Sequence, residues 1–180
     1  KKQCNEIEDV CNGVFLLKEL STRTRDWLVS FGELLSSQII SAALQSEGIN
    51  NAWKDARELI RTDAGFGNAR LDREVTIEQT RAYFNNSSHN LFVIPGFIAS
   101  GPGNITTTLG RGGSDYTAAI IAAVMQASKL QIWTDVSGIM TADPGLVSSA
   151  RVIPHISYQE AMELSHFGAK VIYPPTIQPV

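Results

Sequence analysis

Apolar side chains recur every three to four positions over residues 5–20, which predicts an amphipathic helix. The pattern continues over residues 24–44 as a second, longer helix that stops at Gly48. The inward face predicted for this second helix consists of Trp27, Leu28, Phe31, Leu34, Leu35, Ile39 and Ile40. A glycine inside a helix costs about 1 kcal/mol relative to alanine, so Gly32 indicates close packing or the approach of a ligand.

Beyond residue 49, short β-type runs are separated by turn residues. Residues 91–98 predict a central strand that runs out into a corner at Pro95-Gly96, residues 99–106 a polar, glycine-rich hairpin arm, and residues 130–135 a further strand. The small and apolar residues 115–127 suit a buried helix between the strands. Because strand, helix and strand in this order form a parallel pair with a right-handed crossover, the pattern predicts an α/β protein.

Two capping boxes mark further helix starts. Thr76 is followed by Gln79, and Ser157 is followed by Glu160. In a capping box the first side chain accepts a hydrogen bond from the backbone three residues on, and the second side chain reaches back. These pairs predict helices that begin at Thr76 and at Ser157.

The segment TTTLGRGGSDYTAA, residues 106–119, is the strongest candidate for a binding site. Its three glycines surround Arg111, and Ser114 opens the predicted buried helix. Glycine lets the backbone approach a ligand, and a helix start presents unpaired N–H groups that carry roughly half a positive charge. An arginine at this position can hold a carboxylate or a phosphate with two hydrogen bonds. The segment predicts an anion site, and the alternative is a tight loop in which Ser114 caps a core helix and Arg111 is solvated.

Four other polar residues are candidates for ligand contacts. Glu33 follows Gly32 in the second helix and could meet a cation or face solvent. Thr134 and Asp135 end a predicted strand, at the sheet edge where ligands of parallel α/β proteins bind. Lys170, near the end of the helix that follows Ser157, could neutralise carbonyl charge or reach a phosphate, and the residues alone favour the first role.

Composition and charge exclude several classes of protein. Of the 180 residues 43% are hydrophobic and 18% charged, the net charge is −3, and no block of Lys or Arg could follow a nucleic-acid backbone. Cys4 and Cys11 lie seven residues apart, which favours reduced thiols in the cytoplasm over an intrahelical disulfide. No run approaches the roughly 18 uninterrupted apolar residues typical of a membrane span, so we expect no membrane partner. The histidines, His89, His155 and His166, share no metal-ligand spacing.

Four segments of the chain resemble the kinase portion of aspartokinases, including those fused to homoserine dehydrogenase. They are SFGELLS, TTLGRGGSDYTAA, IWTDVSGIMTADP and SYQEAMELSHFGAKV, and the resemblance extends from about residue 27 to residue 179. It implies the amino-acid-kinase fold, a three-layer αβα sandwich with a mainly parallel sheet. It also implies an ATP-dependent and Mg²⁺-dependent kinase that phosphorylates the β-carboxylate of L-aspartate, in lysine, threonine and methionine synthesis, as a homo-oligomer.

The resemblance implies roles for individual residues of the substrate site. Arg111 resembles the residue that holds the α-carboxylate of aspartate, and Glu33 the acid that accepts its ammonium group. Asp115 resembles the residue that organises the catalytic lysine and the substrate. The rest of the substrate loop comprises Gly112, Gly113 and Ser114.

The nucleotide contacts implied by the resemblance are Thr134, Asp135 and Lys170. Mg²⁺ is expected to be held mainly through the phosphates of ATP, with no dedicated metal ligand from the chain. At two neighbouring positions the chain departs from the family: Met140 stands where an aromatic residue is frequent, and Gly145 where an arginine is frequent. Tyr173 replaces the usual histidine before Pro174.

A segment resembling Lys-Phe-Gly-Gly-Ser/Thr-Ser, which in the family supplies a phosphate-facing lysine, does not occur in the sequence. We therefore expect residues 1–180 to be the C-terminal two-thirds of a catalytic domain, truncated at the N-terminus and inactive or nearly so alone. The expected parts are a helical part (1–48), a substrate-side part with strands and a hairpin (49–109) and a nucleotide-binding part (110–180).

Three alternatives are weighed against an aspartokinase. A related amino-acid or carbamate kinase would share the fold, although SFGE together with GRGGSD favours aspartate. A non-catalytic binding or assembly module would keep the aspartate pocket without turnover. A Rossmann dehydrogenase is disfavoured because the segment Gly101-Pro-Gly103 lacks a third glycine and the strand-to-helix setting.

Overall fold

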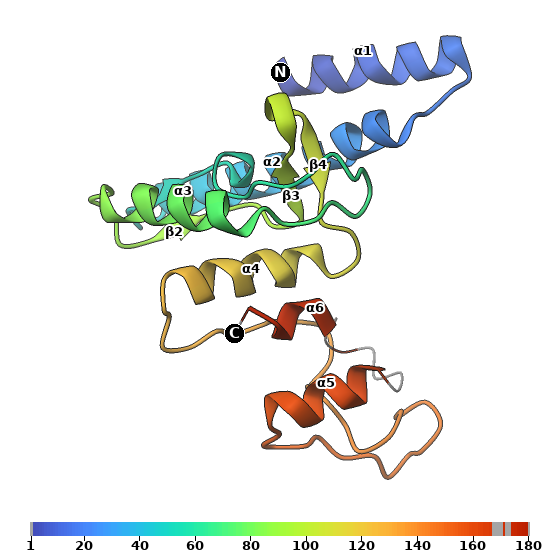
Figure 1. Cartoon of the computed structure of the whole chain (residues 1–180), viewed down its shortest axis with the longest axis vertical. Helices are drawn as coiled ribbons and strands as arrows, with labels where there is room; N and C mark the ends of the chain where they lie inside the picture. Colours follow the sequence, from blue (N-terminus) through green and yellow to red (C-terminus); the bar gives the residue numbers. More distant parts are fainter. Residues whose placement is uncertain (1, 167–170, 172–173, 180) are drawn as a thin grey trace. The chain divides into compact units, whose positions relative to one another are not determined.

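The computed structural model describes residues 2–166, 171 and 174–179 and divides the chain into two compact units, Lys1–Ser114 and Asp115–Val180. The elements of the first unit are α1 (Lys2–Leu17), α2 (Thr22–Ser46), β1 (Ala52–Trp53), the 3₁₀ helix η1 (Ala56–Glu58), α3 (Arg73–Asn85), β2 (Phe92–Val93), β3 (Ile98–Ser100), η2 (Pro102–Asn104) and β4 (Thr106–Thr108) (Figure 1). Helix α4 (Gly113–Val124) begins at the boundary, and α5 (Tyr158–His166) and α6 (Pro174–Ile177) follow.

The strands of the first unit pair in both directions. β1 and β2 are parallel, with Ala52 opposite Phe92, whereas β3 and β4 form an antiparallel hairpin with Ser100 opposite Thr106. A single parallel bridge joins Arg61 to Ser100. The hairpin confirms the prediction for residues 99–106.

The corner predicted at Pro95-Gly96 is confirmed, but the strand predicted over residues 91–98 is not continuous. It is divided into β2 and the first residue of β3, because the chain turns sharply between them at Pro95 to Phe97. Proline has no N–H to donate to a sheet, and it is disfavoured inside a central strand for that reason.

Helix α2 is the packing helix of the first unit and contacts β1, β2 and β4. The Ser21 hydroxyl accepts a hydrogen bond from the Thr24 N–H (3.1 Å), and the helix ends just before Gly48, whose φ of +78° confirms the predicted stop. The helix is also long and apolar enough, by length and composition alone, to cross a membrane.

The inward face of α2 differs from the prediction, since the Ile39 and Ile40 side chains are 66% and 54% exposed. The buried side chains of the helix are Asp26, Ser30, Phe31, Leu34, Ser37 and Ser41. Short polar groups can face the strands because they find partners there: the Trp53 indole donates to the Ser37 hydroxyl (2.9 Å), and the Ser41 hydroxyl donates to the Asn51 side chain (2.6 Å). Gly32 does not mark close packing, since beyond its own stretch of helix backbone no atom of the described residues lies within 4 Å of the position a Cβ would take.

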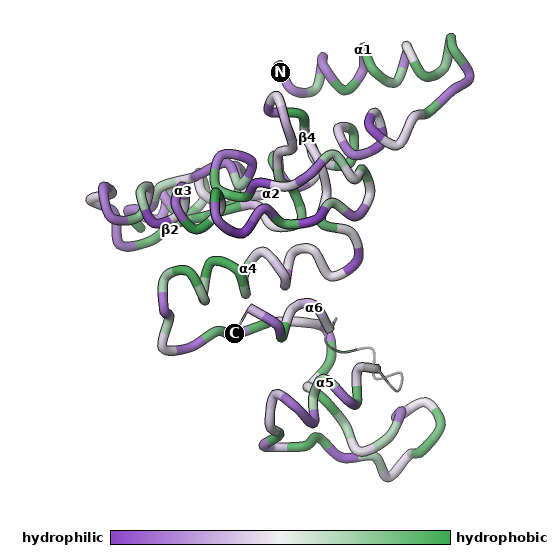
Figure 2. The backbone as a smooth tube through the Cα atoms, in the orientation of Figure 1, coloured by the Kyte–Doolittle hydropathy of each residue, from purple (hydrophilic) through white to green (hydrophobic). Residues whose placement is uncertain are grey.

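Helix α1 confirms the first predicted helix, and hydrophobic and hydrophilic residues alternate along it (Figure 2). It has no buried residue, and it packs mainly against α2. Cys4 and Cys11 are free and exposed, as the spacing predicts.

Helix α3 begins three residues before the predicted start at Thr76. Its N-cap is Asp72, whose carboxylate accepts from the Val75 N–H (3.3 Å). Thr76 is instead fully buried and its hydroxyl accepts from the Arg61 N–H (2.9 Å). The capping box at this position was wrong because a tertiary partner occupies the threonine hydroxyl.

The second unit contains a small hydrophobic core of Ile139, Ala161 and Ile177. Helix α5 begins at the predicted capping box: the Glu160 carboxylate accepts from the Ser157 N–H (2.9 Å), and the Glu160 N–H donates to the Ser157 hydroxyl (3.2 Å). A single antiparallel bridge joins Met140 to Val152.

Residues 130–135 do not form the predicted strand, and the Trp133 side chain is 89% exposed. β-Propensity describes how well a side chain fits a pleated surface, so an apolar run becomes a strand only when another strand pairs with it. Within the described residues, this run pairs with none.

Candidate functional site

The glycines around Arg111 form a tight turn between β4 and α4. Gly110 has φ +74° and Gly112 has φ +67°, a region that side chains other than glycine rarely adopt, and the Gly113 N–H donates to the Gly110 carbonyl (3.0 Å). A Cβ on Gly110 would lie 2.6 Å from Oδ1 of Asn68. Gly110 and Gly112 therefore supply backbone conformations that favour glycine, and Gly110 also leaves room for the side chain of Asn68.

Arg111 occupies the outer position of this turn. Its side chain is exposed, and in the part of the chain that the structure describes it makes no hydrogen bond or ion pair. Helix α4 begins directly afterwards at Gly113, so Ser114 lies in the first turn rather than at the N-cap. The capping role that the alternative interpretation gave to Ser114 does not hold, and the turn presents a guanidinium beside the positive end of a helix.

A second strained turn lies against the glycine turn. Phe97 has φ +70°, and the Ile98 N–H donates to the Gly96 carbonyl (2.8 Å), which closes a three-residue γ-turn. A Cβ on Gly96 would lie 2.7 Å from Cα of Ser114, and a Cβ on Gly113 would lie 2.9 Å from Cδ2 of Phe97. Strain of this kind is concentrated at functional sites, and the Pro95-Gly96 pair was its only signal in the sequence.

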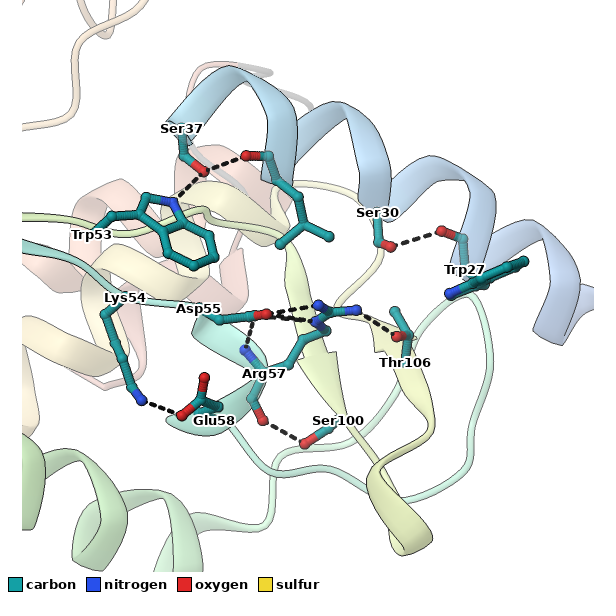
Figure 3. Close-up of polar contacts among 11 residues, drawn as sticks. Trp27, Ser30, Ser37, Trp53, Lys54, Asp55, Arg57, Glu58, Ser100 and Thr106 are labelled. Atoms are coloured by element: carbon teal, nitrogen blue, oxygen red, sulfur yellow. Dashed lines mark hydrogen bonds and ion pairs between the residues drawn. The ribbon is translucent and has the colours of Figure 1, made fainter. Parts of the chain in front are cut away.

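All three threonine hydroxyls of the strand that leads into the glycine turn take part in hydrogen bonds. Thr106 accepts from Nη1 of Arg57 (3.0 Å), and Thr107 shares a hydrogen bond with Thr62 (2.7 Å). Arg57 is itself held by an ion pair with Asp55 (2.6 Å), and its carbonyl accepts from Ser100 (Figure 3).

The third hydroxyl donates to Asp26, a residue that the sequence analysis missed. Asp26 is 1% exposed, and its carboxylate accepts from the Thr108 N–H (3.0 Å), the Thr108 hydroxyl (3.0 Å) and the Gly67 N–H (2.8 Å). An aspartate between Arg25 and Trp27 in a helix carries no local sign of burial, since its partners lie 41 and 82 residues away.

Glu33 and Asp115, the two acids predicted for the site, are both partly buried. Burial raises the pKa of the Glu33 carboxyl and the pKa of the Asp115 carboxyl above their ordinary values. Glu33 lies on α2 and Asp115 in the first turn of α4, two residues beyond Gly113. A partly desolvated carboxylate gains from a bound cation, and acids with raised pKa values are frequent at functional sites.

The predicted nucleotide contacts belong to the second unit. Thr134 and Asp135 are exposed, and the Thr134 hydroxyl donates to the Asp135 carboxylate (3.1 Å). They lie in the irregular run 130–135 rather than at a strand end. Lys170 lies outside the described residues.

The structure brings Arg111, Gly112, Gly113, Ser114 and Asp115 together in one turn and the helix start that follows it. A pocket of about 430 Å³ lies elsewhere in the first unit, at the other end of β4, and none of the predicted site residues lines it. Its lining residues are Arg23, Thr24, Trp27, Gly103, Asn104, Ile105 and Thr106.

The described residues contain no group of three His, Cys, Asp or Glu side chains that could hold a metal ion. Mg²⁺ commonly keeps several waters and binds one or two carboxylates together with substrate phosphates. The exposed carboxylate of Asp135 suits this mode of binding, in which one protein carboxylate joins the phosphates of the substrate.

A tight glycine turn that presents an arginine at a helix start, on an α/β scaffold, is the kind of site that binds a small anionic substrate. Comparison with known proteins identifies the class: residues 3–180 match the Amino acid kinase family, and the chain belongs to that family. The fold is therefore the α/β amino-acid-kinase fold, as the sequence resemblance implied.

Within that family the chain is similar to aspartokinases. It is 40% identical over 183 residues to the bifunctional aspartokinase/homoserine dehydrogenase of Buchnera aphidicola, covering 100% of this chain and 22% of the relative. It is 41% identical to the lysine-sensitive aspartokinase 3 of Escherichia coli, covering 97% of this chain and 40% of that protein.

A crystal structure of E. coli aspartokinase III in complex with aspartate and ADP (R-state) matches with a TM-score of 0.85 and 40% identity, over 97% of this chain and 40% of that chain. The resemblance to aspartokinases is confirmed. The chain spans less than half the length of each of these relatives.

Proposed function

We propose that this chain forms the substrate loop and part of the nucleotide site of an aspartokinase. In the proposed reaction a β-carboxylate oxygen of L-aspartate attacks the γ-phosphorus of ATP. The bond between that phosphorus and the β,γ-bridging oxygen breaks, and the products are 4-phospho-L-aspartate and ADP. Support comes from the similarity to an aspartokinase crystallised with aspartate and ADP.

The observation that carries the proposal is the exposed guanidinium of Arg111, which has no ion-pair partner among the described residues and lies in a turn closed by a backbone hydrogen bond. A planar guanidinium can bind the α-carboxylate of aspartate through two parallel hydrogen bonds. Glu33 would accept the ammonium group of the substrate, which offsets the cost of its own partial burial. Gly112, Gly113 and Ser114 would complete the substrate loop.

Phosphoryl transfer requires little covalent chemistry from the protein. It requires in-line positioning of the two substrates and neutralisation of charge on the transferred group. We assign Asp115 to organising the reacting groups, and Thr134, Asp135 and Lys170 to the nucleotide. When bound to the ATP phosphates, Mg²⁺ would supply charge neutralisation, with Asp135 as the side chain available to it.

Several finer statements belong to the same proposal. We expect a cytoplasmic enzyme of lysine, threonine and methionine synthesis that acts as a homo-oligomer, without a nucleic-acid or membrane partner. The 180 residues alone are expected to show little or no turnover. A non-catalytic module would bind aspartate and give no phosphorylated product under any condition.

The test is formation of aspartyl hydroxamate from aspartate, ATP and hydroxylamine by the protein encoded by the complete reading frame that contains this chain. Arg111→Lys keeps the charge but removes the planar fork, so we expect the KM for aspartate to rise by about 30-fold. The KM for ATP should change by less than about twofold, since the fork is assigned to the other substrate. An equal rise in both constants would contradict the carboxylate role of Arg111.

Asp135→Ala is expected to have the reverse effect. Loss of this carboxylate should raise the KM for ATP by about tenfold, because one contact to the metal or nucleotide disappears. The KM for aspartate should remain within about twofold. Unchanged ATP affinity in a nucleotide titration would remove Asp135 from the nucleotide site.

A further inference from the structure

The carboxylate of Asp26 contacts two segments that converge on the Arg111 turn. One is β4, whose last residue, Thr108, lies three positions before Arg111 and donates to Asp26 from both its N–H and its hydroxyl. The other is the loop at residues 65–68, whose Gly67 N–H donates to the same carboxylate. This loop also contacts the turn, because a Cβ on Gly110 would lie 3.1 Å from the Gly67 carbonyl oxygen.

Asp26 is a buried charge that no lysine or arginine of the described residues neutralises through an ion pair. Three donors take the place of a cation, and hydrogen bonds to an ionised acceptor are about twice as strong as neutral ones. Loss of one donor leaves part of the carboxylate buried without a partner, which costs more than the bond itself. The arrangement therefore resists small displacements of β4 and of the loop.

The same helix carries Glu33 seven residues further on, which is two turns and about 10 Å along the helix axis. Seven residues return to nearly the same face of a helix. Asp26 thus ties the helix that carries the proposed ammonium acceptor, Glu33, to the strand that delivers the proposed carboxylate clamp, Arg111. These two groups would hold opposite charges of one small substrate.

We propose that Asp26 is a positioning residue for aspartate: through Thr108 and Gly67 it fixes the Arg111 turn relative to α2 and thereby sets the affinity for the amino-acid substrate. The inference rests on the proposed function for the identity of that substrate. Its structural part, that Asp26 holds the turn, can be tested separately.

Thr108→Val tests the inference with a nearly isosteric change. It removes the hydroxyl donor to Asp26 and keeps the N–H donor. In the complete protein we expect the KM for aspartate to rise by about five- to tenfold, with the KM for ATP within about twofold. Thr108→Ser retains the hydroxyl and should restore the aspartate KM to near the wild-type value. Asp26→Asn, which turns an amide donor toward another donor, should raise the aspartate KM further.

Thr107→Val is the matched control, because Thr107 is the preceding, fully buried residue of the same strand and its hydroxyl pairs with Thr62 rather than Asp26. It removes a buried hydrogen bond of the same kind and should leave the aspartate KM near wild type. Equal changes in the aspartate KM for Thr107→Val and Thr108→Val would overturn the positioning role.

Hydrogen exchange separates this inference from the proposed function. In the complete protein, Thr108→Val and Asp26→Asn should each accelerate exchange of the backbone amides at residues 109–113, whereas Thr107→Val should not. If the wild-type protein does not phosphorylate aspartate, the proposed function fails and this exchange pattern still decides whether Asp26 holds the turn. If aspartate is phosphorylated but exchange at 109–113 is the same in all three variants, the inference fails and the function stands.

Discussion

The two units of the chain hold their polar groups in different ways. In the first unit, buried side chains such as Asp26, Thr62 and Thr107 find partners tens of residues away in the sequence. In the second unit, the side-chain hydrogen bonds described join residues close in the sequence, as in the capping box of Ser157 and Glu160. Thr176, which is buried in the second unit, has a hydroxyl without a hydrogen-bond partner among the described residues.

Long-range and local hydrogen bonds restrain the backbone to different degrees, and the candidate site residues lie on both kinds of support. A network of long-range buried hydrogen bonds has one low-energy arrangement, since any shift leaves polar groups unpaired. Local caps and turns fix a helix end but place few constraints on the segments between them. The proposed substrate loop is built on the first kind of support, and the predicted nucleotide residues Thr134 and Asp135 lie in a segment of the second kind.

The largest effect is expected from Gly96→Ala, which disrupts the long-range packing of the first unit. The new Cβ would lie 2.7 Å from Cα of Ser114, a backbone atom that cannot move away cheaply. We expect a loss of about 2–3 kcal/mol in the free energy of unfolding, measured by denaturant titration, and a fall in aspartate turnover of about a hundredfold.

Gly32→Ala is the matched control for this substitution. Gly32 is exposed inside α2, and beyond its own stretch of helix backbone no described atom lies within 4 Å of the new Cβ, so alanine should stabilise the protein by about 0.4–1 kcal/mol. If Gly96→Ala were as stable as Gly32→Ala, the close approach of the γ-turn to the start of α4 would be disproved.

An intermediate effect is expected from Glu33→Gln, which sharpens the contrast between stability and function. The KM for aspartate should rise by about tenfold, because the substrate ammonium loses its anionic partner. The free energy of unfolding at neutral pH should be equal to or higher than that of the wild type, since burial disfavours the charged carboxylate.

The pH dependence of this effect has a definite sign. The pKa of Glu33 is raised in the folded state above its ordinary value of 4.5, so the folded wild type binds the proton more tightly than the unfolded chain. The contribution of Glu33 to wild-type stability therefore falls as the pH rises through and above 4.5. Any gain in the free energy of unfolding from Glu33→Gln should therefore shrink below that pH. For aspartate binding the control is Glu78→Gln, a change at an exposed residue of α3 that should leave the KM for aspartate unchanged.

The parts of this structure that the sequence predicted correctly are those that depend on neighbours in the chain. The Gly48 stop, the glycine turn around Arg111 and the cap at Ser157 each follow from a few adjacent residues. Asp26 and the strained Phe97 escaped prediction because their state is set by distant partners and by a close approach of two turns.

The same distinction explains the predictions that were wrong. Ile39 and Ile40 were assigned inward from helical periodicity, but the strands accept the serine face of α2 instead. Residues 130–135 have the composition of a strand, and composition supplies no pairing partner. The roles of the site residues stay predictions that the kinetic experiments must decide.

The smallest effect is expected from Ser157→Ala, which disrupts only a local support of the second unit. Loss of the cap should cost about 1 kcal/mol, seen as faster hydrogen exchange in the first turn of α5. Ser165→Ala in the same helix is the control: the Ser165 hydroxyl donates to the Ala161 carbonyl within the helix (2.8 Å), so its loss should leave exchange unchanged or slower.

The Glu160 half of the capping box adds a pH dependence, because hydrogen bonds from Ser157 lower the pKa of the Glu160 carboxyl below its ordinary value of 4.5. Its stabilising contribution is therefore complete above that value and is lost as the pH falls through the lower, folded-state pKa. If the amides of α5 were equally protected from exchange in Ser157→Ala and Ser165→Ala, the start of α5 would depend on tertiary packing rather than on its local cap. The contrast between long-range and local polar contacts in the two units would then be lost.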